Sequence, residues 1–202
     1  MPTKMKKLKK GQKGLTLVEL VIVIGLTSIV AAVITGTILG VFNTDAHTRN
    51  SMIAVYQVRH AGKLVSEDIL QAQTVNTKDN LDTPEFELLS LTWKEGGTEV
   101  QHMVIYTLKD VPSSELKILW REHYVKESID FELDSTTKVA EYIDPDRTSC
   151  CCDCDGDGVC DDNCNCSKRV VIFTVTATVG ADQQQVSETR VYQVKPRPRL
   201  IT

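Results

Sequence analysis

The feature that most constrains this chain is an apolar run of 28 residues, from Leu15 to Phe42, in which Glu19 is the only charged residue. As a helix the run would rise about 42 Å, more than the roughly 30 Å hydrocarbon core of a bilayer. It therefore predicts a transmembrane helix over 15–42. A carboxylate at membrane depth costs about 2.5–3.5 kcal/mol on insertion scales, so Glu19 requires a partner or a function.

Charge is divided unequally between the start of the chain and the rest. Six lysines lie in the first fourteen residues: Lys4, Lys6, Lys7, Lys9, Lys10 and Lys13. The remainder holds 17 basic and 27 acidic residues, a net charge of −10. A basic start is typical of the cytoplasmic flank of a membrane segment, which places the remainder outside the cytoplasm. We expect no nucleic-acid partner for the acidic remainder, because a phosphate backbone is held through Lys and Arg.

Two ordinary kinds of membrane-targeting segment compete to explain the run. A secretory signal has a shorter apolar region followed by a small-residue cleavage site. Ala31 and Ala32 could imitate such a site, but the apolar run continues past them. A plain membrane anchor explains the length and the lysines, yet it leaves the carboxylate of Glu19 unexplained.

The stretch "KGLTLVEL" at 13–20 resembles the type IV prepilin signature: a basic leader ending in Gly, then a hydrophobic residue, Thr, Leu, an aliphatic residue and Glu. The resemblance implies that a membrane-embedded prepilin peptidase cuts between Gly14 and Leu15, and that the new amine of Leu15 is N-methylated. It also implies that Glu19 pairs with the amine of a neighbouring subunit during filament assembly. Such a pair offsets desolvation that neither charge could bear alone. Leu15 departs from the family, which more often has Phe there.

After Phe42 the chain turns polar but keeps a helical pattern. Apolar residues recur at spacings of three and four: Ala54, Val58, Ala61, Val65, Ile69 and Ala72. This stripe predicts one long helix from about 17 to 74, with its second half packed on a globular head. Strands are predicted at 85–93, 99–108, 115–125, 168–180 and 187–194. The predicted fold class is α+β, a pilin-like lollipop with a long N-terminal helix packed on an antiparallel β-sheet.

The clearest strand is 168–180. One set of alternate residues would face one side (Val171, Phe173, Val175, Ala177 and Val179), and the other set would face the opposite side (Ile172, Thr174, Thr176 and Thr178). A turn at 180–182 would join it to 187–194 as a hairpin. The tail from Lys195 contains two prolines, which break regular pairing. The domain boundaries follow: a cleaved leader over 1–14, the long helix over 15–75, and a β-rich head over 80–202.

The rest of the helix and the following strands resemble the minor-pilin group that includes J-type pseudopilins of type II secretion and W-type minor pilins. The resemblance rests on an acidic-hydrophobic-Gln stretch over 67–72, "YTL" at 106–108 and "LWR" at 119–121. It implies a structural subunit that inserts in the membrane and assembles through its helix with other pilins, at or near the tip of the filament. K-type tip subunits typically lack the acid, so Glu19 argues against that subtype.

A Cys/Asp-rich loop, "SCCCDCDGDGVCDDNCNCS" at 149–167, is the other informative stretch. Its acids follow the spacing of a calcium loop, with Asp153, Asp155 and Asp157 at positions one, three and five, the carbonyl of Val159 at seven and Asp161 at nine. Position twelve, which should be Glu, is Cys164, and no helical pattern flanks the loop. The stretch also resembles a thrombospondin type 3 repeat that is two residues short. We predict Ca²⁺ binding here; a solvated acidic loop is the alternative.

All seven cysteines of the chain lie in this loop: Cys150, Cys151, Cys152, Cys154, Cys160, Cys164 and Cys166. Local density of this kind suits an exported, oxidised segment. Adjacent cysteines do not easily bond each other, so two or three disulfides to separate partners are expected, with the connectivity left open. Zinc or an iron–sulfur cluster is the rival, although the spacings miss the usual Cys-x2-Cys knuckles.

No catalytic constellation is predicted. His47, His60, His102 and His123 are scattered, and none stands in a recognisable nucleophile motif. Two function classes remain: a structural subunit of a pilus or secretion pseudopilus, and an adhesive or ligand-binding tip module that uses the Cys/Asp loop. The major shaft subunit is a variant of the first class. In each case the expected location is the cytoplasmic (inner) membrane with the head outside, then a periplasmic or cell-surface filament.

Overall fold

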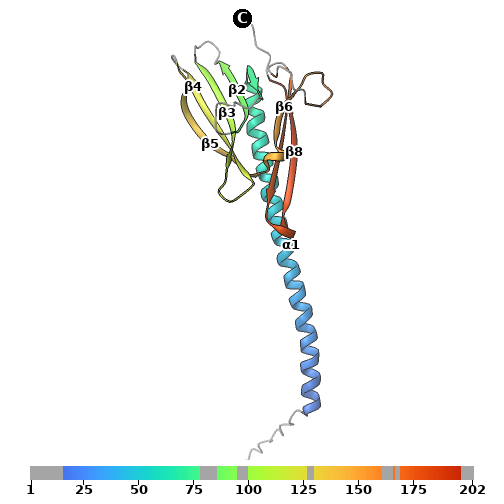
Figure 1. The fold of residues 1–202 in the computed structure, drawn as a ribbon. Coiled ribbons are helices and arrows are strands. Elements are labelled where there is room, and N and C mark those ends of the chain that lie inside the picture. The colour runs from blue at the N-terminus through green and yellow to red at the C-terminus, as the bar shows by residue number, and fades with distance from the viewer. Residues whose placement is uncertain are drawn as a thin grey trace, which may run out of the picture. The chain divides into compact units, whose positions relative to one another are not determined.

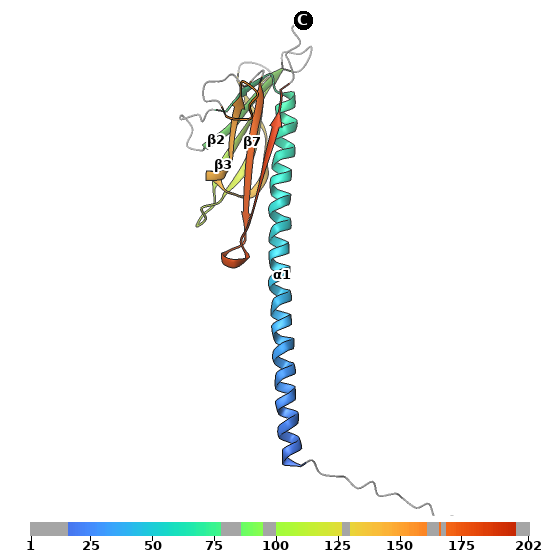
Figure 2. The same ribbon diagram turned by 90° about the vertical axis from the view of Figure 1, so that its right-hand side faces the viewer.

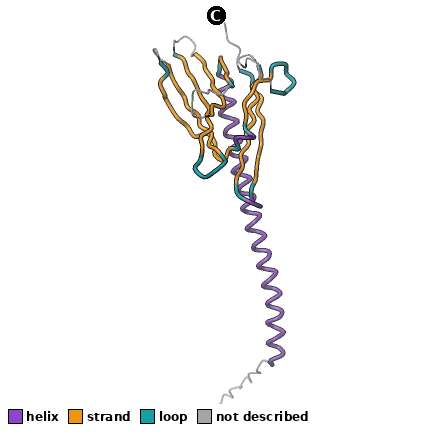
Figure 3. Tube along the Cα trace, viewed as in Figure 1, coloured by secondary structure: helices purple, strands orange, loops and turns teal. Residues whose placement is uncertain are grey.

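The computed structural model describes residues 16–77, 86–94, 100–126, 130–160, 166 and 169–196. These residues form one helix, α1 (Leu17–Gln71), and eight strands, which are β1 (Thr74–Asn76), β2 (Phe86–Lys94), β3 (Gln101–Asp110), β4 (Lys117–Lys126), β5 (Glu132–Ile143), β6 (Ser149–Asp153), β7 (Val170–Val179) and β8 (Val186–Val194). Short 3-10 turns lie at η1 (Pro145–Arg147) and η3 (Asp182–Gln184). Figures 1 and 3 show the helix and the strands. The predicted α+β fold, a long helix packed on an antiparallel sheet, is confirmed.

The chain divides into two compact units at residues 45 and 46. In the first unit the apolar side chains of α1 are exposed along its length, from Leu17 to Phe42. Its hydroxyl side chains bond carbonyls of the preceding turn at 2.7–3.0 Å: Thr27, Ser28, Thr35, Thr37 and Thr44. These polar groups are therefore satisfied within the helix, as a lipid environment requires.

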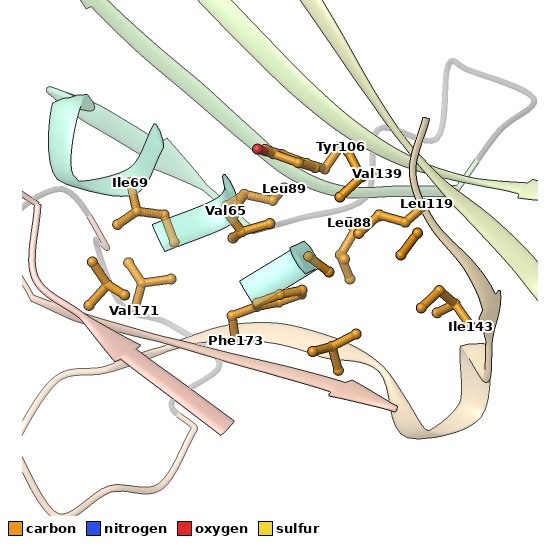
Figure 4. Close-up of a cluster of buried hydrophobic side chains, with 14 of the residues drawn as sticks. Val65, Ile69, Leu88, Leu89, Tyr106, Leu119, Val139, Ile143, Val171 and Phe173 are labelled. Atoms are coloured by element: carbon orange, nitrogen blue, oxygen red, sulfur yellow. The ribbon is translucent and has the colours of Figure 1, made fainter. Parts of the chain in front are cut away.

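In the second unit, one face of α1 is buried. The predicted apolar stripe is confirmed, because Ala54, Val58, Ala61, Val65, Ile69 and Ala72 are all 0–1% exposed. Figure 4 shows Val65 and Ile69 between side chains of two groups of strands, with Leu89 and Tyr106 on one side and Val171 and Phe173 on the other. This face supplies the centre of the core.

The strands are antiparallel throughout and form one sheet in the order β1-β2-β3-β4-β5-β7-β6, with β8 on the other side of β7. Strands β2 to β5 follow one another as a meander. The link to β7 is narrow: Ile143 pairs with Ala177, and the amide of Asp144 donates to the carbonyl of Thr176 at 3.0 Å. The sheet therefore has two parts, and Figure 1 shows β2 to β5 to the left of the second half of α1 and β6 and β8 to its right. In the view turned by 90°, Figure 2 shows β2, β3 and β7 beside the same flank of the helix.

The alternation predicted for 168–180 is confirmed in β7. Val171, Phe173, Val175, Ala177 and Val179 belong to the core cluster. On the opposite side, Thr176 Oγ1 lies 2.8 Å from Thr189 Oγ1, and Thr178 Oγ1 lies 2.8 Å from Ser187 Oγ. Each hydroxyl thus finds a cross-strand partner on β8, which confirms the predicted hairpin.

A buried ionic contact ties α1 to β3 and β4. Asp68 is 8% exposed, and it accepts hydrogen bonds from Tyr106 Oη at 2.5 Å and from Arg121 Nε and Nη2 at 2.7 and 3.1 Å. Burial, together with the neighbouring carboxylate, raises the pKa of Tyr106 far above its usual range. The tyrosine therefore remains a donor at every physiological pH.

Three elements differ from the sequence predictions. The helix ends at Gln71 rather than near 74, because residues 74–76 pair with β2 as a short strand. Strand β5 was not predicted. Residues 149–153 form strand β6 instead of the start of a loop, with Cys152 and Asp153 buried. The last residues of the predicted tail, 197–202, lie outside the described part of the chain.

Candidate functional site

The first candidate site is the start of α1. The hydroxyl of Thr16 accepts a hydrogen bond from the amide of Glu19 at 3.3 Å, and the carbonyl of Thr16 accepts one from the amide of Leu20 at 3.1 Å. Thr16 is therefore the N-cap of the helix, and Glu19 lies at the third helical position. Gly14 and Leu15, the predicted cleavage residues, lie outside the described part of the chain.

The capping role of this stretch was missed by the sequence interpretation. Thr16 and Glu19 have the spacing of a capping box, Thr-x-x-Glu, in which the acid is also favoured by the positive end of the helix dipole. This spacing is the signal in the sequence that predicts the cap. The structure shows the Thr16 half of this box, the bond from the Glu19 amide to the Thr16 hydroxyl, and the side chain of Glu19 is exposed.

Helix α1 is long and apolar enough to cross a membrane, judged by length and composition. No residue of its most apolar window is buried within the structure. The exposed large apolar side chains run without a charged interruption from Leu20 to Phe42. A helix of this kind needs lipid or other helices as its surroundings.

The second candidate site begins where β6 ends, at Asp153. This carboxylate is 5% exposed, and its two oxygens accept hydrogen bonds from the amides of Gly156 at 2.6 Å and Gly158 at 3.0 Å. Both glycines have positive φ, +89° and +83°, which side chains with a Cβ rarely adopt. The two glycines therefore allow the chain to curl around the carboxylate of Asp153.

Two exposed aspartates complete the turn. Asp155 Oδ1 accepts from the amide of Asp157 at 3.2 Å, and Asp157 Oδ1 accepts from the amide of Val159 at 2.8 Å. Carboxylate oxygens of Asp153, Asp155 and Asp157 lie within 4.8 Å of one another. The structure thus brings together three of the predicted calcium ligands in an arrangement that could bind a metal ion. Asp161 lies outside the described residues.

Disulfides join this turn to β6. Cys151 bonds Cys160, and Cys152 bonds Cys166, with Cα–Cα distances of 5.5 and 5.3 Å. The adjacent cysteines thus have separate partners, and Cys154 is disulfide-bonded as well. Thr77 Oγ1 lies 3.7 Å from Cys152 Sγ and 3.6 Å from Cys166 Sγ, so this disulfide packs beside the end of β1.

A disulfide sulfur is not a thiolate, so the cysteines in these bonds cannot serve in the rival zinc or iron–sulfur site. Cys150, one of the disulfide candidates, is a free thiol that packs against the core, and burial raises its pKa to about 12. Cys164 lies outside the described residues.

Comparison with known proteins identifies the N-terminal site. Residues 9–35 match the family described as the prokaryotic N-terminal methylation motif. A search of curated proteins found no match, and neither did a search of solved structures. The matched range covers the basic residues from Lys9, the Gly14–Leu15 pair, Glu19 and much of the apolar run. The chain therefore has the N-terminus of a type IV pilin or pseudopilin, followed by a pilin-like α+β fold.

Proposed function

We propose that this chain is a structural subunit of a type IV pilus or a secretion pseudopilus, and specifically a minor pilin or pseudopilin at or near the filament tip. The observation that carries the proposal is the methylation motif over 9–35, which runs directly into an exposed apolar helix. The resemblance of 67–72, 106–108 and 119–121 to J-type pseudopilins and W-type minor pilins supports the minor subtype. The contact between Asp68, Tyr106 and Arg121 links these three segments in space.

Processing and assembly follow from the motif. Prepilin peptidase would cut between Gly14 and Leu15 after insertion in the inner membrane, and the amine of Leu15 would be methylated. The carboxylate of Glu19 would then pair with the amine of a neighbouring pilin in the filament. Within a bundle of apolar helices such a pair attracts strongly, because little water screens it. The chain would pass from the membrane to a periplasmic or cell-surface filament.

Mass spectrometry of sheared filaments tests this proposal directly. A peptide that begins at methylated Leu15, in trace amounts relative to another pilin, supports a minor subunit. The same N-terminus at dominant abundance makes this chain the major shaft pilin instead. Retention of Met1, with the chain remaining in the membrane fraction, contradicts the prepilin function.

The charge of Glu19 can be separated from its capping role. Glu19→Gln removes the charge, but Gln is also favoured at this position of a capping box. Thr16→Val removes the capping hydroxyl and keeps the charge. If Glu19 acts in assembly, Glu19→Gln abolishes incorporation into filaments while membrane insertion and cleavage persist. Thr16→Val should incorporate. Filaments that incorporate Glu19→Gln but not Thr16→Val would contradict an assembly role for the charge.

We also propose that the turn at Asp153, Asp155 and Asp157 binds Ca²⁺, with the carbonyl of Val159 and the carboxylate of Asp161 as further ligands. Hard oxygen ligands on a tight, glycine-containing turn suit this ion. Isothermal titration of the full chain in detergent should give heat of binding that Asp155→Asn together with Asp157→Asn removes. Asp146→Asn, an exposed acid of η1, is the matched control. No heat and no thermal stabilisation by Ca²⁺ contradicts the proposal.

A second candidate function is an adhesive or ligand-binding module at the tip, which would use the same Cys/Asp loop. Val159 lies between two disulfide-bonded parts of the chain, and its apolar side chain is 62% exposed. An exposed apolar side chain of this kind favours a binding function. Replacing 155–159 with a Gly/Ser turn distinguishes the functions. Normal filaments that lose attachment support a binding function, whereas lost filaments support an assembly role for the loop.

A further inference from the structure

Four neighbouring strands bring two histidines, a tryptophan and an aspartate together. Trp93 of β2 pairs directly with His102 of β3, and His123 lies on the adjoining strand β4. Asp134 belongs to β5, the next strand of the meander. His123 is half-buried, with 17% of its side chain exposed, whereas the side chain of Asp134 is 56% exposed. This cluster could not be predicted from spacing, because His102 and His123 are 21 positions apart in the sequence.

One nitrogen atom of each imidazole ring points towards a nitrogen atom of the other ring. His102 Nδ1 lies 3.1 Å from His123 Nε2, the ring planes differ by 10°, and the ring centroids are 5.3 Å apart. His123 Nδ1 lies 2.9 Å from Asp134 Oδ2. Because an ionised carboxylate only accepts, His123 Nδ1 carries the proton of that bond. His123 Nε2 therefore has its lone pair directed towards His102.

We propose that His102 and His123 bind a divalent transition-metal ion such as Zn²⁺ or Cu²⁺, and that Asp134 is a positioning residue that holds His123 in the ligating tautomer. Metal–imidazole bonds of about 2.0–2.1 Å at a tetrahedral angle separate two ligand nitrogens by about 3.3 Å. The observed 3.1 Å is close to that separation. To ligate, both rings must turn so that their lone pairs converge on the ion, and His102 must carry its proton on Nε2 so that Nδ1 has a free lone pair. Water completes the coordination.

The chemistry of this cluster differs from that of the Asp153 turn. Imidazole nitrogen suits Zn²⁺, Cu²⁺ and Ni²⁺, whereas a set of carboxylates suits Ca²⁺. A carboxylate that accepts the second N–H of a ligating histidine is the usual outer partner at such metal sites. Trp93 supplies an apolar wall, with its ring 5.3 Å from that of His102 and 6.1 Å from that of His123. A structural hydrogen bond between the rings is the competing explanation, and it requires no metal affinity.

The fluorescence of Trp93 can be used to measure metal binding. The chain has two tryptophans, so Trp120→Phe leaves Trp93 as the sole reporter. In full-length chain in detergent micelles, Cu²⁺ should quench Trp93 fluorescence with saturation at one ion per chain. Displacement of bound Cu²⁺ by added Zn²⁺ then gives the affinity of the site for Zn²⁺. His102→Gln and His123→Gln should each weaken binding by about 100-fold or more, and Asp134→Asn by about 10–100-fold.

Two controls separate this site from others. His60→Gln removes a histidine that stacks on Tyr56 of the helix, and Asp155→Asn with Asp157→Asn removes the acidic turn; neither should change the affinity. Nitrogen-15 NMR should show Zn²⁺ shifting His102 Nδ1 and His123 Nε2, and it reports the His123 tautomer in Asp134→Asn even if stability changes. Absence of saturable binding, or equal binding by the histidine variants, overturns the proposal. Unchanged affinity and tautomer in Asp134→Asn overturns the positioning role.

Discussion

The ring of Tyr192 on β8 lies against Gly62 of α1, in the space that a Cβ on that glycine would occupy. The Tyr192 hydroxyl donates a hydrogen bond to the carbonyl of Val58, one turn earlier, at 3.1 Å. Gly62 is therefore required by close packing rather than by backbone conformation. This contact fixes the distance between the helix and the outer strand of the β7–β8 hairpin.

Gly62→Ala should destabilise the head by about 1–3 kcal/mol, because the ring of Tyr192 must move, although Ala favours helix by up to about 1 kcal/mol. Thermal unfolding of the full chain in detergent measures the change. Gly36→Ala is the matched control, since a Cβ there meets nothing within 4 Å. A Gly62→Ala protein as stable as the control variant would contradict the packing argument.

The Asp68 contact should be among the most sensitive points of the fold. Asp68→Asn leaves the guanidinium of Arg121 without its carboxylate partner, which should cost about 3–5 kcal/mol. Tyr106→Phe removes one hydrogen bond to a charged acceptor and should cost about 1.5–3 kcal/mol. Denaturant unfolding provides both values. Asp68→Asn and Tyr106→Phe proteins of equal, near-native stability would show that this contact is unimportant.

Glu122 should make the stability depend on pH. Burial raises the pKa of this carboxyl, but hydrogen bonds from Lys109 at 2.8 Å and Tyr124 at 2.9 Å outweigh that effect, so the pKa lies below its ordinary value. A lowered pKa stabilises the folded state above the unfolded pKa of about 4.3. This stability is lost as the pH falls from there through the folded pKa.

The expected result is that Glu122→Gln is less stable than wild type at pH 7, and that the difference shrinks as the pH is lowered below about 4. Thermal melts from pH 7 to pH 3 follow this difference. Glu115→Gln, an exposed acid before β4, is the control and should follow wild type throughout. A difference that grows on acidification would reverse the sign and exclude this explanation.

Cys150 should be chemically inert in the folded protein. Its pKa of about 12 leaves almost no thiolate near pH 8, and the thiolate is the reactive form. We expect iodoacetamide to label Cys150 only after denaturation, as measured by peptide mass spectrometry without reduction. Rapid labelling of the native protein at Cys150 would show that the thiol is accessible and ionised.

The elements that were predicted from the sequence have strong periodicity. The stripe from Ala54 to Ala72 repeats every three or four residues, and its burial follows directly from that spacing. The alternation in β7 identifies the face that joins the core cluster, although Thr176 and Thr178 on the other face are buried as well. Strand β5 lacks such a signal: residues 132–138 are all exposed. Its formation depends on pairing with β4, which no local pattern encodes.

The candidate sites also differ in how far they could be predicted from the sequence. The Asp153 turn was predictable because its carboxylates lie at alternate positions of one short stretch and glycines mark the turn. Strand β6 was missed because its cysteines were interpreted only as disulfide partners, although Cys152 is also a core residue at 2% exposure. The meeting of His102 with His123 depends on the register of β3 and β4, in which Val104 pairs with His123. In a hairpin such as β3–β4 the register is set by the connecting turn and by which face is buried, and neither strand's own pattern specifies which residues become neighbours.

The hydroxyls of the apolar helix have a consequence for movement between environments. Thr27, Ser28, Thr35, Thr37 and Thr44 each bond a carbonyl of their own helix. None of these hydroxyls has to exchange a partner when the surroundings change from lipid tails to neighbouring helices. In the proposed passage from a bilayer to a filament, the transfer of this segment would therefore be governed by shape and van der Waals contact, and the surface that faces lipid in the membrane would face neighbouring subunits in the filament.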